Sequence, residues 1–481
     1  MADSSWLTGV ALVELLIQVT GLLFYFRTRG RTLAEALATA LVTTLMLTSL
    51  LQQTTWLLSL PPLFPLPEAA ALGCVIIAFQ NRQGAKKVYR DLKNFLPKRH
   101  PVILGILAVC IGYIGLKALL FVPGTHHPNF FHTMVLYSQS SGMLGANDVV
   151  ISHHFLRFGT VFGTAVPGFM AYTAMLFATY ALSRRYAWVP ISFTVTAMVA
   201  SIPRFVLSGA GPGFEIIPVS VALLALLLAY RLVETPNAMD GFLVVCSLSF
   251  LFSSSSAGFL VSLILAALFC LLMFRRHGFL PLSTVKNRWR KILASVVACF
   301  FFSRLWNGFP PPLFHGVKKN GEGLAGAAVS FMKYLIASTD GPVPLDLLQT
   351  AFKPDHIIKL LTPNWLFPGN QVFPGESATA VFNLPWFGPL AFLFVQPAVI
   401  YAMFRGPRRL KAVALALGAY VYLICLIPAW KPENLCYFSY FYALAGFFPA
   451  FLFPPWRLGI WAKRGLQILC ILVLFQTCLA L

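Results

Sequence analysis

Charge is scarce in this chain: charged residues make up only 11% of its 481 residues, and just 15 residues are acidic. Hydrophobic residues account for 58%, and the mean hydropathy is +0.76. These values lie far outside the balance of a soluble domain, so a soluble globular protein is excluded. The apolar residues gather into runs of about 20, the length at which a helix crosses the roughly 30 Å hydrocarbon core of a bilayer. We therefore expect an all-α, polytopic integral membrane protein.

Several motifs that mark common functions are also missing. The chain has no GxxxxGK[ST] or GxGxxG fingerprint, which argues against an enzyme driven by a nucleotide. Its nine cysteines form no CxxC pair and lie almost entirely within apolar runs, so we interpret them as small packing residues. No repeat with a period of about 20 to 50 residues is visible. The start carries Asp3 and no cationic region, so the first apolar run is expected to be a retained helix.

Lysine and arginine outnumber the acidic residues by 36 to 15, which gives a formal net charge of +21. Clusters of these cations fall into alternate gaps between apolar runs, as expected when cytoplasmic loops retain them. Because apolar helices bound the clusters, anionic lipid headgroups are nearer partners than nucleic acid, which we do not expect to bind. The predicted inner loops contain residues 27–31, 82–99, 184–185, 275–291, 405–411 and 457–464.

This alternation predicts about 14 transmembrane helices in a cell membrane, with both termini and the long loops on the extracytoplasmic side. The run from Gly241 to Phe274 is split in two at Ser253 to Ser256, because the flanking Arg231 and Arg275 belong on the same side. The spans are expected near residues 6–26, 36–60, 68–80, 101–122, 160–182, 189–207, 215–232, 241–252, 258–274, 292–306, 387–404, 412–429, 437–455 and 465–481.

The spans divide the chain into regions. Residues 1–100 hold about three N-terminal helices added before a transmembrane core. The core covers residues 101–306 and includes a first outer loop at residues 123–159, and residues 387–481 form the C-terminal helices. Between them lies a large extracytoplasmic loop, residues 307–386, in which the apolar spacing of residues 324–338 and 345–361 suits helices at the membrane surface. We expect this loop to be folded.

The first outer loop is the densest candidate site. Asp148 is a candidate general base toward an acceptor hydroxyl that attacks a sugar carbon. Histidine pairs could instead ligate a transition metal, contact a phosphate or be ordinary interface residues. Neither pair has the i, i+4 spacing of a helical zinc motif, so no metal ligands are assigned, and a divalent metal stays an open cofactor. The loop contains His126, His127, His132, Tyr137, Asp148, His153, His154 and Arg157.

Three arginines lie in or beside apolar spans on the predicted outer face, against the positive-inside trend. Arg157, Arg204 and Arg304 are interpreted as ligands of a donor phosphate, because arginine binds phosphate through two parallel hydrogen bonds. For the lysines of the large loop, solvated surface is the favoured interpretation. The substrate-binding candidates are Tyr137, His153, His154, Glu215, Glu376, Lys431 and Glu433.

Polar residues also lie inside two predicted spans. Glu14 and Gln18 are in the first span, and Gln52 and Gln53 are in the second. Ionisable residues at this depth are costly and often functional. We favour a polar contact between neighbouring helices, with proton-coupled transport as the alternative.

Several short segments follow one another in an order that resembles the GT-C superfamily of membrane glycosyltransferases. The resemblance is to the bacterial branch similar to glycosyltransferase family 39, and it covers most of the chain. In that family the corresponding segments are the first outer loop, a short outer turn with an acid, a surface helix, the entry to a span and the last outer turn. The segments here are Pro128 to Thr133, Ser201 to Arg204 with Gly211 to Glu215, Phe331 to Asp340, Phe387 to Leu390, and Trp430 to Tyr437.

The resemblance implies transfer of a sugar from a polyprenyl-phosphate donor to a glycan, lipid or protein acceptor. Members of the family use an acidic residue of the first outer loop as the base, and His132 occupies the corresponding position here. Either His132 takes that role, Asp148 supplies the carboxylate, or the chain has lost transferase activity. The donor phosphate would meet Arg204 and Arg157.

Two other classes of function stay open. Glu14 and the break at Ser253 to Ser256 favour a transporter or lipid flippase, whereas the lack of an inverted repeat and the folded outer loop argue against one. The other class is a catalytically inactive GT-C-like scaffold, or a histidine-based metal module in the first outer loop.

Overall fold

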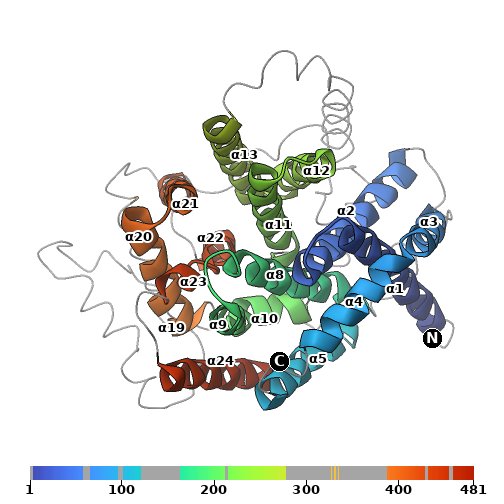
Figure 1. The fold of residues 1–481 in the computed structure, drawn as a ribbon, viewed down its shortest axis with the longest axis horizontal. Coiled ribbons are helices and arrows are strands. Elements are labelled where there is room, and N and C mark those ends of the chain that lie inside the picture. The colour runs from blue at the N-terminus through green and yellow to red at the C-terminus, as the bar shows by residue number, and fades with distance from the viewer. Residues whose placement is uncertain are drawn as a thin grey trace, which may run out of the picture. The chain divides into compact units, whose positions relative to one another are not determined.

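All regular structure in the described part of the chain is helical, which confirms the all-α prediction (Figure 1). By length and composition, 7 of these helices can cross a membrane, or up to 8 spans form if one bent pair of helices counts as a single span. The predicted total of about 14 spans stays a prediction. The computed structural model describes residues 4–57, 66–95, 101–120, 163–211, 215–277, 387–427, 432–453 and 459–480, together with Ala327, Ser330, Phe331 and Tyr334.

The chain forms two compact units. Unit 1 consists of Met1–Ala181 and Ser208–Pro312, and unit 2 of Leu182–Leu207 and Leu313–Leu481. The helices described in unit 1 are α1 (Ser4–Thr28), α2 (Leu33–Leu57), α3 (Leu66–Gln80), α4 (Arg82–Phe95), α5 (Pro101–Leu119), α8 (Val166–Ser183), α11 (Ile216–Glu234), α12 (Ala238–Ser254) and α13 (Ser256–His277). Those that begin in unit 2 are α9 (Val189–Ala200), α10 (Pro203–Ala210), α19 (Gly388–Leu390), the π-helical η2 (Ala391–Val395), α20 (Gln396–Arg405), α21 (Arg408–Leu426), the 3-10 helix η3 (Pro432–Tyr437), α22 (Phe438–Ala445), α23 (Pro449–Leu452) and α24 (Ile460–Ala480).

Helix α11 is the most completely enclosed element of unit 1. From Ile216 to Val233 every residue except Arg231 is buried. A helix that is apolar on all sides belongs in the interior of a helical protein, and α11 packs against α12, α13 and α2. In the same unit, α1 packs against α2, α3 and α4 (Figure 1).

The break predicted inside the run from Gly241 to Phe274 is confirmed. Helix α12 ends at Ser254 and α13 begins at Ser256, with Ser255 between them in an extended conformation. The Ser255 hydroxyl accepts a 3.0 Å hydrogen bond from the Gly258 amide and so caps the start of α13. The serine run therefore ends one helix and starts the next.

Two other predicted spans are wrong as single helices. Residues 189–207 form α9 and α10, which are bent by 67°. Pro203 lacks an amide hydrogen and disfavours a helical conformation at Ile202, so the chain turns there. Residues 437–455 contain α22 and α23, separated by a turn at residues 446–448. Gly446 begins this turn, and a Cβ atom there would lie 2.7 Å from Val199 Cγ2.

Residues 82–95, which the charge alternation places in an inner segment between two spans, form the helix α4. The charge pattern carried no prediction of their secondary structure, and lysine and arginine are good helix formers. The helix is held against α1 along one face, and its contacts there supply the packing that a polar helix lacks in isolation.

Two glycines let α1 approach its neighbours closely. A side chain at Gly21 would collide with the Cys74 carbonyl oxygen of α3, and one at Gly84 of α4 would collide with the Phe24 carbonyl oxygen of α1. Backbone atoms cannot move aside as side chains can, so both positions require glycine. Close approach through small residues is the usual way in which helices associate within a membrane.

Replacing Gly21 with alanine is therefore expected to lower the free energy of unfolding by about 1–3 kcal/mol, because the new methyl group overpacks the contact between α1 and α3. Gly73→Ala in α3 is the matched control, since nothing lies within 4 Å of its added Cβ atom. Thermal unfolding in one detergent measures both variants. Equal stability of Gly21→Ala and Gly73→Ala would contradict the close approach.

Candidate functional site

Only part of the predicted site lies in the described residues. Arg204 is a half-buried residue in the first turn of α10, Glu215 is the residue before α11, and Glu433 belongs to η3. These three come from separate segments, and only Arg204 and Glu433 belong to unit 2. The other predicted site residues lie outside the described residues: His132, Tyr137, Asp148, His153, His154, Arg157, Arg304, Glu376 and Lys431.

Arg204 stands directly after a break in the helical path of unit 2. The Ser201 amide still donates to Ala197 O at 3.0 Å, and the Ser201 hydroxyl donates to Met198 O at 2.8 Å. These bonds end α9, and Pro203 starts α10 in a new direction. The break thus places the Arg204 side chain at the bend between α9 and α10. In a straight helix, Arg204 would lie on a continuous helix face.

The segment Phe387 to Leu390 packs against this break. The Phe387 ring is 1% exposed and lies 6.1 Å from the Phe205 ring, at an interplanar angle of 73°. Gly388 has φ +77°, and a Cβ atom there would lie 3.5 Å from Pro203 Cδ. Glycine accepts this left-handed conformation without strain. Two segments almost 200 residues apart in sequence therefore meet at one place.

Tyr442 of α22 completes this aromatic contact. Its ring stacks on Phe387 with centroids 4.2 Å apart and an interplanar angle of 28°. The Tyr442 hydroxyl accepts a 2.7 Å hydrogen bond from Gln396 Nε2. We call the set formed by the Ser201–Phe205 segment, Phe387, Gly388 and Tyr442 the break cluster.

The end of η3 and the start of α22 are fixed by further contacts in unit 2. Tyr420 of α21 donates its hydroxyl to Tyr437 O at 2.7 Å. Tyr334, which is fully buried and helical, lies 4.8 Å from the Phe438 ring. Tyr334 of the segment Phe331 to Asp340 thus lies against Phe438, the first residue after Trp430 to Tyr437, and Tyr442 of the break cluster follows one turn later.

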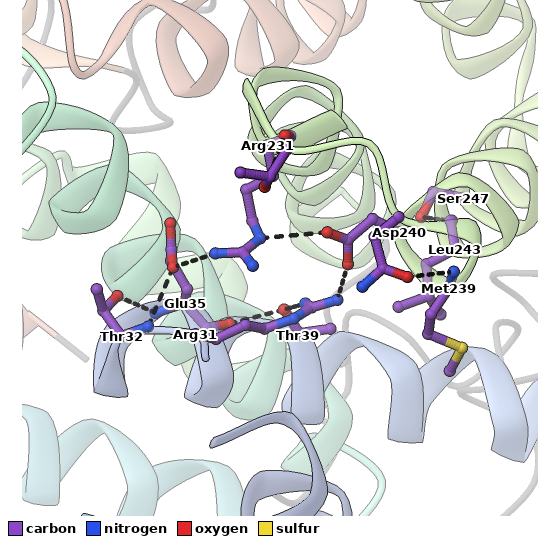
Figure 2. Close-up of polar contacts among 11 residues, drawn as sticks. Arg31, Thr32, Glu35, Thr39, Arg231, Met239, Asp240, Leu243 and Ser247 are labelled. Atoms are coloured by element: carbon purple, nitrogen blue, oxygen red, sulfur yellow. Dashed lines mark hydrogen bonds and ion pairs between the residues drawn. The ribbon is translucent and has the colours of Figure 1, made fainter. Parts of the chain in front are cut away.

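A second polar site, in unit 1, was not predicted (Figure 2). Arg31, in the turn between α1 and α2, is 2% exposed and pairs with Asp240, which is 1% exposed and lies in the first turn of α12. Arg231 of α11 bridges both acids: Nη1 lies 2.7 Å from Glu35 Oε2, and Nε lies 3.3 Å from Asp240 Oδ2. Two arginines and two acids balance each other, and we call these four residues the charge network.

Neighbouring groups hold the charge network in place. Thr39 accepts a hydrogen bond from Arg31 Nη1, and the Arg31 guanidinium lies 4.4 Å from the centre of the Phe26 ring. Burial lowers the pKa of Arg31 to about 10, and the carboxylate of Asp240 opposes this shift. Arg31 therefore stays charged at neutral pH. A charge at this depth is tolerated only when it is paired and hydrogen-bonded.

One sequence signal for this network was present. Thr32 and Glu35 form a capping box at the start of α2: the Thr32 amide donates to Glu35 Oε2 at 3.1 Å, and the Glu35 amide donates to Thr32 Oγ1 at 3.3 Å. The T-x-x-E spacing predicts the helix start and the position of Glu35. Its pairing with Arg231, 196 residues away, follows only from the tertiary structure.

The network brings together segments that the charge pattern had assigned to one side of the membrane. Arg27 pairs with Asp91 of α4 through contacts of 2.6 and 3.2 Å, and its Nη1 donates to Arg31 O at 2.9 Å. Arg276 donates to Glu234 O at 3.3 Å. The ends of α1, α11 and α13 and the starts of α2 and α12 therefore lie at one end of unit 1. An open depression of about 630 Å³ there is lined by Arg29, Gly30, Arg231 and residues 235–238.

The polar residues inside the first spans lie around a small cavity of unit 1. Glu14 and Gln18 of α1, Thr48 of α2 and Pro67 of α3 line a space of about 10 Å³, enough for one water molecule. Gln18 is 2% exposed, and its Oε1 atom has no hydrogen-bond partner among the residues that the structure describes. These residues lie where α1, α2 and α3 meet. The favoured polar contact between neighbouring helices stays a prediction.

Comparisons with known proteins give no relative. No protein-family model, no curated protein and no solved structure matches this chain. Within the described residues, no group of three or more histidine, cysteine or acidic residues is placed to hold a metal ion.

Phe387→Ala is expected to lower the free energy of unfolding by about 3–5 kcal/mol, because the buried ring contacts both Phe205 and Tyr442 and its removal leaves a cavity. Phe404→Ala is the matched control in unit 2, since this phenylalanine is 73% exposed. Thermal unfolding in detergent compares the two. An equal loss of unfolding free energy in both variants would contradict the contribution of the buried Phe387 ring to stability.

Asp240→Asn keeps the size of the side chain and removes its charge, so Arg31 loses its buried counterion. We expect the free energy of unfolding to fall by about 3–5 kcal/mol. Asp91→Asn is the control: Asp91 and Arg27 have side chains that are 28% and 19% exposed, and a loss of about 0–1 kcal/mol is expected there. Denaturant unfolding followed by circular dichroism gives both free energies of unfolding. Equal losses in the two variants would contradict the larger contribution of the buried Arg31–Asp240 pair.

Proposed function

We propose that this chain is a membrane glycosyltransferase of the GT-C type, which transfers a hexose or pentose from a polyprenyl-phosphate donor to an acceptor on the extracytoplasmic face. The acceptor is a glycan, a lipid or a protein. The proposal joins the family resemblance of the sequence to an all-helical chain with at least 7 helices long and apolar enough to span a membrane.

The observation that carries the proposal is the break cluster. In sequence, Ser201 to Arg204 resembles the short outer turn of the family, and Phe387 to Leu390 resembles its entry to a span. In the structure Phe205 and Phe387 are in ring contact, and Gly388 lies against Pro203. Two motifs of one active-site region would be expected to meet, and unrelated chance matches would not.

Arg204 is the proposed ligand of the donor phosphate. It directly follows the bend between α9 and α10, at which the helix axis changes direction by 67°. A guanidinium group there would form charge-assisted hydrogen bonds with a phosphate and stabilise the charge that develops as the phosphate leaves. Arg157 and Arg304 are the other proposed phosphate ligands and lie outside the described residues.

The proposed reaction is a direct displacement. Asp148, or His132 in its place, accepts the proton of the acceptor hydroxyl as the oxygen attacks the sugar carbon. The bond between that carbon and the phosphate oxygen breaks, and the polyprenyl phosphate leaves with the electron pair. Attack from the opposite side inverts the configuration at the sugar carbon. Tyr137, His153, His154, Glu215, Glu376, Lys431 and Glu433 stay proposed substrate contacts.

Contacts in unit 1 support the proposed orientation in the membrane. Arg27, Arg231 and Arg276 come from three segments that the charge alternation assigns to the cytoplasmic side, and the contacts around the charge network bring these segments together. Since the alternation places the long loops opposite these cations, the donor site would face away from the cytosol.

A transporter or lipid flippase is the second candidate. Gln18 lines a cavity for one water molecule between α1, α2 and α3, of which α1 and α2 can cross a membrane. The bent pair of α9 and α10 resembles the discontinuous helices of transporters. A catalytically inactive GT-C-like protein is the remaining alternative.

Purified protein is expected to transfer radiolabel from one member of a panel of polyprenyl-phosphate sugars to an acceptor, or to hydrolyse that donor slowly. Arg204→Ala is expected to lower kcat/KM for the donor by about tenfold or more, since one charge-assisted contact with phosphate is lost. Arg204→Lys should recover part of this loss, because lysine keeps the charge without the bidentate geometry.

Arg405→Ala serves as the control, because it removes an exposed cation of unit 2 far along the sequence from the break. Donor turnover by the native chain together with unchanged kinetics for Arg204→Ala would contradict the phosphate site. Full activity of both Asp148→Ala and His132→Ala would contradict the proposed base. If the protein moved the donor across vesicle membranes without transferring the sugar, the transferase proposal would be wrong and the chain would be a transporter or lipid flippase.

A further inference from the structure

Helix α4 carries a cationic face that the proposed transferase reaction does not use. The helix contains five basic residues and one acidic residue. At about 100° per residue, the basic residues Arg82, Lys86, Arg90 and Lys93 fall within one stripe of the helix surface, and Tyr89 lies at its edge beside Arg82. All five residues are exposed, and Tyr89 is 69% exposed.

The opposite face of α4 is held against α1. Gly84 is buried against the Phe24 carbonyl oxygen, and Asp91 forms two contacts with the Arg27 guanidinium, at 2.6 and 3.2 Å. The single acid of the helix is therefore committed to α1, and no carboxylate interrupts the exposed stripe. Its positive charge is directed away from the protein.

Helix α4 crosses the end of α1 instead of running along it. Just before α4, Asn81 Oδ1 lies 2.9 Å from Thr28 Oγ1, while Gly84 meets Phe24 and Asp91 meets Arg27. These three contacts, which span residues 81 to 91, all fall on the last two turns of α1, between Phe24 and Thr28. Because α1 can cross a membrane from Gly9 to Thr28, this end of α1 marks the level of the lipid headgroups.

We propose that the exposed stripe of α4 binds the headgroups of anionic phospholipids. Lysine and arginine donate charge-assisted hydrogen bonds to phosphate, and each basic residue near an anionic surface strengthens binding by about fivefold. Tyr89 suits the same depth, since tyrosine keeps its ring against apolar chains and its hydroxyl in the polar layer. The location at the end of a span favours lipid over a soluble polyanion.

The test uses the full chain in detergent and two lipids labelled on the acyl chain, phosphatidylglycerol and phosphatidylcholine. Replacing Arg82, Lys86, Arg90 and Lys93 together with glutamine is expected to weaken phosphatidylglycerol binding by at least about tenfold and to leave phosphatidylcholine binding unchanged. For the native chain, added salt should reduce the preference for the anionic lipid.

A second quadruple variant provides the matched control. Glutamine at Arg275, Arg405, Arg408 and Arg464 removes the same charge from exposed positions on other segments, and it should weaken phosphatidylglycerol binding less than the α4 variant does, because these four cations share no single helix face. An equal loss in both quadruple variants would overturn the proposal in favour of net charge alone. Polyglutamate and unlabelled phosphatidylglycerol are compared as competitors of the labelled lipid. If polyglutamate displaced the lipid at the lower concentration, the lipid proposal would be overturned in favour of a soluble acidic partner.

Loss of folding in the α4 variant is separated from loss of binding by thermal unfolding and by single substitutions. Lys86→Gln and Lys93→Gln remove exposed side chains and should each weaken phosphatidylglycerol binding by about fivefold with native unfolding temperatures. Native binding in both single variants would overturn the proposal even if the quadruple variant failed to fold.

Discussion

The buried pair of Arg31 and Asp240 is the constraint on which the arrangement of unit 1 depends. A charge removed from water must be matched nearby, because its desolvation costs several kcal/mol or more. Asp240 lies 209 residues from Arg31, so this requirement joins the turn after α1 to the start of α12. Arg231 and Glu35 extend the same requirement to α11 and α2. The four helices are thereby fixed at one end.

In unit 2, aromatic packing takes the place that buried ion pairs have in unit 1. Its described contacts around the break cluster are aromatic, with Phe387 between Phe205 and Tyr442. Ring contacts of this kind carry no net charge, and they hold the bend that Arg204 follows. The proposed phosphate site and the scaffold that positions it are therefore built from different residue types. In the charge network of unit 1, by contrast, ion pairs between two arginines and two acids hold the helices together.

Sequence reasoning identified elements well where a local signal was sufficient. The break at Ser255 was predicted from the serine run and the charges around it, and the structure confirms it. The bend at Pro203 was missed because a window of apolar residues reports composition and not the direction of the helix axis. Helix α4 was missed because its cations were counted as a cluster, although their spacing at positions 82, 86, 90 and 93 is that of a helix face.

For the candidate site, too, the sequence predicted some features and only the structure showed others. Arg204 was selected from sequence as a cation beside an apolar run, and its position at a bend came only from the structure. Glu35 and Asp240 were left out of every predicted site, because an acid near a loop looks like solvated surface when its partner is far away in sequence. Asp148 and His132 lie outside the described residues and stay predictions.

By itself the sequence determined that this is a helical membrane protein, because apolar content and run length are summed along the chain and need no knowledge of contacts. It also predicts which segments share a side of the membrane, since the charge alternation depends only on the order of residues along the chain. Only the tertiary structure decided which charges are buried. Arg31 reads as an ordinary loop cation, yet it is enclosed, because burial depends on neighbours brought from more than 200 residues away.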